Sequence, residues 1–177
     1  GGGVLAMDVD PQAIQAAQKR LEGFMTAVIV ERESYSNLEQ TAARHGFHQV
    51  DGILFDLGLG SLQLGGESRG FSFTSDDALD MRFDPDQELT ASQVVNRYPE
   101  ERLALILKEY GEEPRTRTIA RWIVRNRPIS SARQLAQIIG RAVGGARGRI
   151  NPATRGFQAL RVYVNREQEN LKEALPQ

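Results

Sequence analysis

Apolar and polar positions along the first 56 residues form blocks that predict strands and helices in turn. Short apolar runs at residues 4–7, 27–30 and 50–55 are typical of buried strands, whereas segments 11–21 and 38–45 carry apolar side chains at helical spacing. We expect Asp10, just before Pro11, to cap the first helix and Gly46 to end the second. This alternation predicts an α/β fold with a parallel, doubly wound sheet.

The periodicity changes in the second half of the chain. Segments 92–95, 100–110, 116–126 and 132–143 have apolar faces of helical period, and no strand pattern occurs between about residues 85 and 150. Segment 154–175 predicts one long helix. We therefore expect a partial α/β core at residues 1–70, an inserted all-α domain at 71–150 and a return to the core at 151–177.

Composition excludes several classes of protein. The chain has no cysteine and only two histidines, so neither a thiolate metal site nor a histidine-based metal cluster is expected. Its apolar runs are far shorter than a membrane span and no secretory signal is visible, so we expect no membrane and a cytoplasmic location. Since the sequence begins with three glycines rather than Met, we expect it to be a fragment.

Charge is divided unevenly between the two halves. Residues 1–100 hold 16 acidic and 7 basic side chains, whereas residues 101–177 hold 7 acidic and 15 basic ones. Between Pro114 and Arg166 there are twelve arginines and no Asp, Glu or Lys. Arginine is preferred where phosphates are bound, so this stretch predicts a nucleic-acid partner. The alternative is a solvated helix face, although such faces usually mix both signs of charge.

Four side chains follow the predicted strands or the glycine-rich loop after them. Asp8 could accept two hydrogen bonds from a ribose, or could instead belong to the cap of the next helix. Tyr35 could stack on an adenine ring, or could be an ordinary tyrosine at the edge of the core. Asp56 and Gln63 flank the loop and could hold a ligand amine or a base, although Asp56 could also be a turn residue.

Six sequence blocks together resemble the bacterial 16S rRNA (cytosine-N4)-methyltransferase family. They are DVDPQAI (8–14), DGILFDLGLGSLQL (51–64), RGFSF (69–73), LDMRFD (79–84), YGEE (110–113) and NPATRGFQALRVYVN (151–165). The resemblance covers essentially the whole chain. It implies a Rossmann-like class I methyltransferase sheet, incomplete here, with an inserted all-α domain. It also implies S-adenosylmethionine as cofactor and methylation of a cytosine of 16S rRNA in the small ribosomal subunit.

By matching position, the resemblance implies cofactor contacts for Asp8, Tyr35, Asp56 and Gln63. Asp56 is also our candidate for accepting the proton of the target amine. We expect six arginines to bind rRNA phosphates: Arg82, Arg115, Arg117, Arg121, Arg125 and Arg155. For Arg155, the alternative is that it braces the sheet.

The chain also departs from the family pattern. Asn151 replaces a histidine and Gly156 a threonine. The family's glycine-rich cofactor loop and its closing strand motif are expected upstream of Gly1 and beyond Gln177. Because that upstream strand is central to this class of sheet, we expect this chain alone to bind the cofactor poorly.

The sequence also raises two other interpretations. The chain could be a nonenzymatic RNA-binding fragment built on the arginine-rich helices. A nucleotide-binding dehydrogenase is disfavoured, because no G-x-G-x-x-G motif precedes Asp8 and hydride transfer has no use for such helices.

Overall fold

The computed structural model describes residues 2–60, 69–145 and 151–177. The chain divides into two compact units, of which unit 1 comprises Gly1–Leu62, Phe83–Pro85 and Glu167–Gln177. Unit 2 comprises Gln63–Arg82 and Asp86–Arg166. Within the described residues there are eight α-helices and one two-stranded parallel sheet, so the chain is a mixed α/β structure.

The sheet of unit 1 consists of β1 (Val4–Asp8) and β2 (Val28–Arg32), which pair in parallel from Val4 opposite Val28 to Asp8 opposite Arg32. Helix α1 (Pro11–Arg20) and the 3₁₀ turn η1 (Glu22–Phe24) connect them. The predicted cap is confirmed, since the Asp10 carboxylate accepts the Gln12 N–H at 3.0 Å. A crossover helix between parallel strands is the unit expected of an α/β fold.

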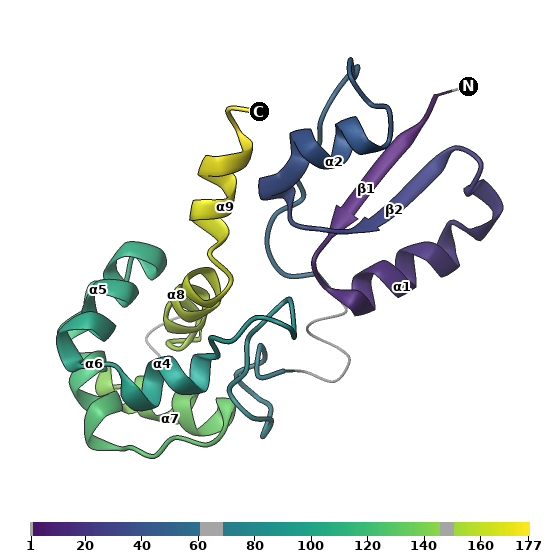
Figure 1. Cartoon of the computed structure of the whole chain (residues 1–177). Coiled ribbons are helices and arrows are strands. Elements are labelled where there is room, and N and C mark those ends of the chain that lie inside the picture. The colour runs from purple at the N-terminus through teal and green to yellow at the C-terminus, as the bar shows by residue number, and fades with distance from the viewer. Residues whose placement is uncertain (1, 61–68, 146–150) are drawn as a thin grey trace. The chain divides into compact units, whose positions relative to one another are not determined.

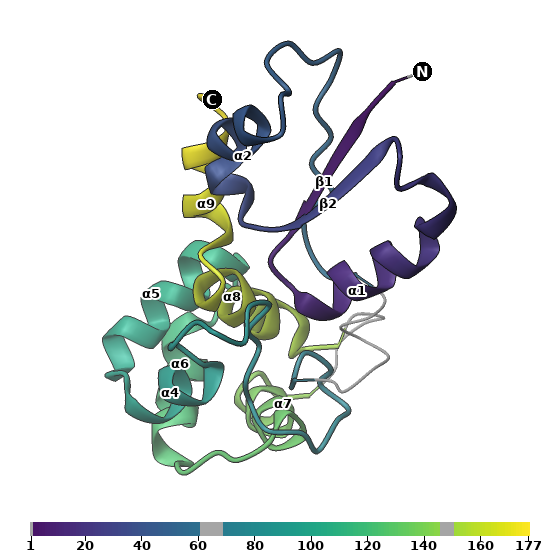
Figure 2. The same cartoon turned by 45° about the vertical axis from the view of Figure 1, so that its right-hand side comes forward.

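The chain leaves β2 through the 3₁₀ turn η2 (Tyr35–Asn37) and helix α2 (Leu38–Arg44). Figures 1 and 2 show α1 and α2 on different sides of the strand pair. Gly46 ends α2 with a φ of 78°, which confirms its predicted role as a stop. Helix α9 (Glu167–Ala174) belongs to the same unit and packs against η2.

The predicted strand at residues 50–55 is wrong. This segment is not a strand, and it pairs with no strand in the part of the chain that the structure describes. Leu54 is 91% exposed and Ile53 is 56% exposed. A strand needs a hydrogen-bonding neighbour, and an apolar run cannot supply one by itself. The apolar pattern therefore identified side chains that are suited to burial, but these side chains are exposed in the structure.

Unit 2 is built from helices. They are α4 (Ala91–Arg97), α5 (Glu100–Gly111), α6 (Thr116–Arg125), α7 (Ala132–Ala142) and α8 (Thr154–Val164). A capping box between Thr90 and Gln93 begins α4, and the Ser131 side chain caps α7. These positions confirm the predicted helices, with boundaries shifted by a few residues at most.

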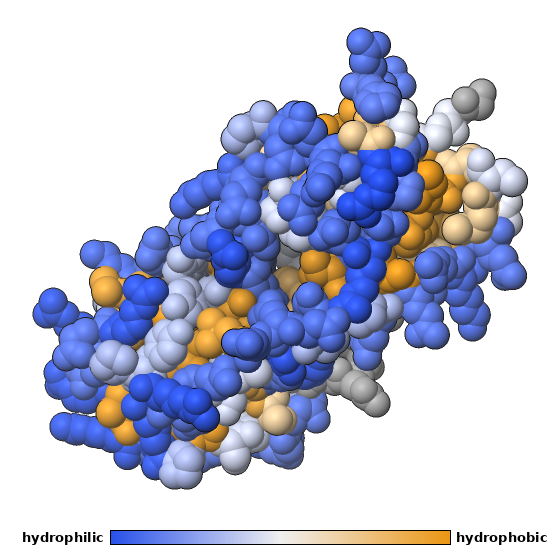
Figure 3. Space-filling view, viewed as in Figure 1, coloured by the Kyte–Doolittle hydropathy of each residue, from blue (hydrophilic) through white to orange (hydrophobic). Residues whose placement is uncertain are grey.

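The two units differ sharply in burial. Among the described residues of unit 1, Ala174 is the only buried apolar side chain, whereas unit 2 buries Leu103, Ile119, Leu135 and Leu160 to within 1% of full burial. Exposed apolar side chains gather around the strand pair, as Figure 3 shows. Each fully buried Leu or Ile stabilises a fold by roughly 1.5–3 kcal/mol, so unit 2 holds most of the hydrophobic stabilisation.

Helices α5 and α8 run in opposite directions and approach closely. A Cβ on Gly111 would lie 2.5 Å from the Arg155 carbonyl oxygen, so glycine permits the contact between the end of α5 and the start of α8. At Gly156, a Cβ would lie 2.8 Å from Cδ1 of Ile139. The Ile139 side chain thus occupies the space that the family threonine would need.

The prediction of one long helix at residues 154–175 is wrong. The helix ends at Val164 and resumes at Glu167, and Arg166 between them has a φ of 50°. The buried Asn165 amide donates to the carbonyl oxygens of Met81 at 2.7 Å and Arg161 at 2.9 Å. These hydrogen bonds fix Asn165 against a distant segment of unit 2. The boundary between the units falls just after it, so α8 belongs to unit 2 and α9 to unit 1.

None of the helices described is long and apolar enough to cross a membrane.

Candidate functional site

Asp8 lies at the carboxyl end of β1, where ligands bind in open α/β sheets. It is exposed, and its Oδ1 accepts the Asp10 N–H at 2.8 Å. The carboxylate therefore shapes the turn into α1, which was the structural alternative for this residue. Shaping the turn does not prevent an exposed carboxylate from accepting ribose hydroxyls as well.

An ion pair that the sequence did not predict braces the same end of the sheet. Arg32, opposite Asp8 on β2, pairs with Asp84 at 2.6 Å, and its Nε donates to the Val9 carbonyl at 3.2 Å. Arg32 thus links the β1–α1 turn to a segment some fifty residues away in sequence. Only the RFD sequence at the end of the LDMRFD block could have drawn attention to Asp84, and it names no partner.

Tyr35 follows β2 at the same end of the sheet and is half-buried. Its hydroxyl donates to the Glu167 carbonyl at 3.1 Å, and its ring lies edge-on to Phe55 with centroids 5.9 Å apart. Burial, followed by the charges of Glu167 and Glu169, raises the pKa of Tyr35, so the hydroxyl remains a donor at neutral pH. The contact with Phe55 brings the segment that carries Asp56 toward this end of the sheet.

Asp56 is exposed and directly follows Phe55, but it ends no strand. Gln63 lies outside the residues that the structure describes. Among the described residues, no group of three or more metal-ligand side chains is placed to hold a metal ion. The described candidates, Asp8, Tyr35 and Asp56, offer carboxylates that accept hydrogen bonds and an aromatic ring that can stack, which are the groups that a nucleoside needs.

Arg82, one of the six predicted RNA contacts, is bonded within unit 2. Its guanidinium donates to both carboxylate oxygens of Asp80 at 2.7 Å and to the Gln87 carbonyl at 2.6 Å. Burial alone would raise the pKa of Asp80, but the hydrogen bonds and charge of Arg82, with the charge of Arg69, hold that pKa below its usual value. We infer that Arg82 positions the loop before α4.

This pair predicts acid sensitivity. Because the folded pKa of Asp80 is depressed, its stabilisation is present above the unfolded pKa of about 3.9 and is lost as the pH falls below it. At pH 7, the D80N variant should have a lower free energy of unfolding than the parent chain. On going to pH 3, that free energy should fall less for D80N than for the parent. Urea unfolding monitored at the single tryptophan, Trp122, measures both. In the D76N control, which removes an exposed ion pair with Arg133, the free energy of unfolding should change little. Equal losses of stability in D80N and D76N would contradict the stabilising role of the Asp80–Arg82 pair.

The other predicted RNA contacts lie mostly on exposed helix surfaces. Arg117, Arg121 and Arg125 are spaced four residues apart on α6, all are exposed, and they lie opposite the buried Ile119 and Ile123. Arg121 meets Glu100 at 3.4 Å, which offsets part of this charge. Arg115 bonds to the Val143 carbonyl, whereas Arg155 is exposed at the start of α8. Arg117, Arg121 and Arg125, called the α6 stripe below, are therefore the largest exposed group among the predicted phosphate contacts.

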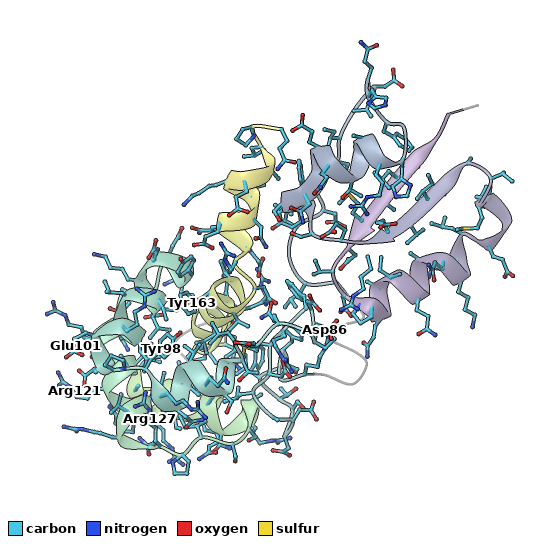
Figure 4. The ribbon with its side chains drawn as sticks, viewed as in Figure 1. Asp86, Tyr98, Glu101, Arg121, Arg127 and Tyr163 are labelled. Atoms are coloured by element: carbon cyan, nitrogen blue, oxygen red, sulfur yellow. The ribbon has the colours of Figure 1, made fainter. Side chains whose placement is uncertain are left out.

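Arg127 shows that the arginine-rich stretch also has structural members. Its guanidinium donates to the carbonyl oxygens of Val95 at 2.7 Å and of Tyr98, at the end of α4, and burial lowers its pKa. It lies only two residues from Arg125, and Figure 4 labels it in the helical unit. Nothing in the sequence separates these two arginines by role.

The chain is similar to known proteins along its whole length. The model of a family described as the MraW methylase family matches residues 2–177. Proteins named ribosomal RNA small subunit methyltransferase H, from two strains of Dehalococcoides mccartyi, are 48% identical over 177 residues and are covered to 51% of their length. One of the same name from Thermotoga neapolitana is 44% identical over 97% of this chain and 59% of its own. The chain spans about half the length of the curated relatives it matches.

Proposed function

The chain belongs to the MraW methylase family, and from this premise we propose that it is part of an S-adenosylmethionine-dependent enzyme that methylates the N4 amine of a cytosine in 16S rRNA. The observation that carries the proposal is the family match over residues 2–177, together with an exposed aspartate at the carboxyl end of β1. The relatives' names state an rRNA methyltransferase of the small subunit. We further propose that helices α4 to α7, which lie within residues 71–150, form the inserted domain.

The roles of the residues follow from their chemistry. S-adenosylmethionine supplies an electrophilic methyl group on a sulfonium. Asp8 would hold the ribose through two accepted hydrogen bonds, and Tyr35 would line the site beside the base. Asp56 would accept a hydrogen of the cytosine amine and take up its proton as nitrogen attacks. Since in-line attack depends on alignment, holding both substrates in place would supply much of the rate.

The substrate side of the proposal rests on the arginines of unit 2. The exposed α6 stripe and Arg155 would bind phosphates of rRNA, and unpaired bases would have to leave their stack to be methylated. Two phenylalanines of unit 2 could stack on such a base, but Phe71 is 5% exposed, and the ring of Phe73 lies edge-on to that of Phe157 with centroids 6.1 Å apart. Both are better explained as packing residues of unit 2.

The test is transfer of labelled methyl from S-adenosylmethionine to small ribosomal subunits, followed by nucleoside mass spectrometry. We would assay this chain and a version extended to the length of its relatives. We expect N4-methylcytidine with the extended version and little or none with the chain alone, because residues 50–55 lack a strand partner among the described residues. Methylation at another atom, or none with the extended version, would overturn the proposal.

A second candidate is a nonenzymatic RNA-binding fragment. The observation that favours it is that the buried apolar side chains are concentrated in unit 2, whereas unit 1 buries little apolar surface. Such a fragment would bind 16S rRNA with a strong salt dependence and would not bind S-adenosylmethionine. Calorimetric titration with the cofactor separates the two candidates for the extended protein.

A matched pair of variants tests the division among the arginines. For R125Q, we expect unchanged stability, weaker rRNA binding and a salt slope smaller by about one. For R127Q, we expect an unchanged salt slope and a loss of about 2 kcal/mol in the free energy of unfolding, because two carbonyl groups lose a charged donor. Urea unfolding and fluorescence anisotropy at several salt concentrations measure these effects, and identical behaviour of the two variants would contradict the division.

A further inference from the structure

Three tyrosines from different elements of unit 2 converge on one arginine. Tyr98 ends α4, Tyr110 lies near the end of α5 and Tyr163 near the end of α8. The Tyr163 ring centroid is 6.1 Å from that of Tyr98 and 5.7 Å from that of Tyr110. Helical side chains lean toward the N-terminus, and in the antiparallel helices α5 and α8 these directions bring Tyr110 and Tyr163 together.

Arg102 completes this cluster from the first turns of α5. Its guanidinium carbon lies 5.5 Å from the centroid of the Tyr163 ring, and its Nη2 donates to the Tyr163 hydroxyl at 3.2 Å. Tyr163 in turn donates to the Tyr98 hydroxyl at 3.4 Å. The four side chains are therefore held in one arrangement, which lowers the entropic cost of binding a ligand there.

The charge of Arg102 is left for an outside partner. It is exposed, and within the described residues its interactions go to tyrosines rather than to a carboxylate. The nearby Glu100 is engaged by Arg121 at 3.4 Å. In the view of Figure 4, Glu101 lies toward Arg121 and away from Tyr163. An exposed, uncompensated guanidinium beside aromatic rings favours an anionic ligand that also carries a flat ring.

The ring geometry leaves surfaces available for stacking. The Tyr98 and Tyr163 rings meet at 81° and the Tyr110 and Tyr163 rings at 57°, so neither pair is stacked face to face. All three tyrosines are partly exposed. A guanidinium plane over a ring extends such a surface, because bases stack on arginine as well as on tyrosine.

From this arrangement we propose that Tyr98, Arg102 and Tyr163 form a stacking site for an unpaired nucleotide of RNA. Its residues belong neither to the α6 stripe nor to the candidates for methyl transfer. A base stacks on the tyrosine–arginine surface, and its phosphate accepts hydrogen bonds from the guanidinium. The inference rests on the proposed function, since it assumes an RNA substrate, and it adds a site that reads unpaired RNA. Tyrosine and arginine are also common at protein interfaces, so a protein partner is an outcome of the test.

The test uses NMR of the chain with ¹³C-labelled tyrosine rings. The chain has four tyrosines. The signals of the three tyrosines in the cluster are therefore compared with the signal of Tyr35 in unit 1, which serves as an internal reference. On titration with a single-stranded RNA dodecamer of mixed sequence, we expect the Tyr98 and Tyr163 signals to move and that of Tyr35 to stay. The same sequence as a duplex should bind through arginines without moving them.

Variants test the contribution of the ring. We expect Y163L to bind the dodecamer at least about fivefold more weakly, and Y163F, which keeps the ring, to bind within twofold of the parent. F24L, which removes an exposed aromatic of unit 1, is the matched control and should change nothing. If Y163L fails to fold, R102Q replaces it, with weaker binding and a salt slope smaller by about one.

Three outcomes would overturn the stacking site. If the dodecamer binds with strong salt dependence while the tyrosine signals stay, the site is wrong although the proposed function survives. If the dodecamer does not bind at all, the site is also wrong, and the methyl-transfer assay separately decides the function. If RNA-free small-subunit proteins move the Tyr98 and Tyr163 signals where RNA does not, the cluster binds a protein instead.

Discussion

Replacing Gly70 with alanine is expected to lower the free energy of unfolding of unit 2 by about 3 kcal/mol or more. Gly70 has a φ of 78°, a conformation that alanine adopts at a cost of roughly 1–2 kcal/mol. In addition, its Cβ would lie 2.4 Å from the Ala78 carbonyl oxygen, which is backbone and cannot rotate away. The loop around Gly70 is tied down, because its neighbour Arg69 accepts the Met81 N–H at 2.7 Å.

Two other glycines serve as graded controls for G70A. G111A adds a close approach of 2.5 Å to the Arg155 carbonyl without a positive φ, so it should cost less than G70A. Around Gly140, in α7, a Cβ would meet no atom within 4 Å, so G140A should leave stability unchanged or raise it by up to about 1 kcal/mol. Urea unfolding followed at Trp122 in α6 measures all three. Equal midpoints for G70A and G140A would refute this account of the loop.

Replacing Asp8 with asparagine is expected to weaken S-adenosylmethionine binding by about 10- to 150-fold in the protein extended to the length of its relatives. Hydrogen bonds to charged groups contribute roughly 1.5–3 kcal/mol, and about 1.4 kcal/mol corresponds to a tenfold change in affinity. Asparagine retains an oxygen that can accept the Asp10 N–H, so D8N keeps the turn into α1. The loss should therefore appear in cofactor affinity and leave stability nearly unchanged.

The control for D8N is D51N, which neutralises an exposed aspartate that we assign to no site. Isothermal titration gives the affinity, and urea unfolding shows whether either variant has lost stability. If D8N binds the cofactor as tightly as D51N does, Asp8 contributes only to the turn, and the ribose contact must be sought elsewhere at the end of the sheet. If D8N mainly loses stability, the structural role of the carboxylate is the larger one.

Much of the architecture could be predicted because it depends on patterns among residues that are close in sequence. The helices of unit 2 follow from apolar residues at helical spacing, and the start of α1 follows from Asp10 and Pro11. The ordered sequence blocks resemble an rRNA methyltransferase family, and the family match shows that the chain belongs to the MraW methylase family. These features need only neighbouring residues, or the order of residues, to be recognised.

The predictions that failed depended on partners distant in sequence. Residues 50–55 have the apolar pattern of a strand, but a strand forms only when another backbone accepts and donates its hydrogen bonds. The break between α8 and α9 arises because Asn165 bonds to Met81, more than eighty residues earlier. Neither the missing strand partner nor the hydrogen bond to Met81 can be recognised from neighbouring residues alone.

The sequence by itself determined which residue types are present, where α1 and the helices from α4 to α7 form, and which family the chain belongs to. Only the tertiary structure decided what each charged or aromatic side chain contacts. Arg125 and Arg127 cannot be told apart from the sequence. In the structure, Arg125 is exposed on α6, whereas Arg127 donates hydrogen bonds to carbonyl groups at the end of α4. The physical reason is that the partner of a side chain is set by packing between elements, whereas the propensity of an element is set by its own residues.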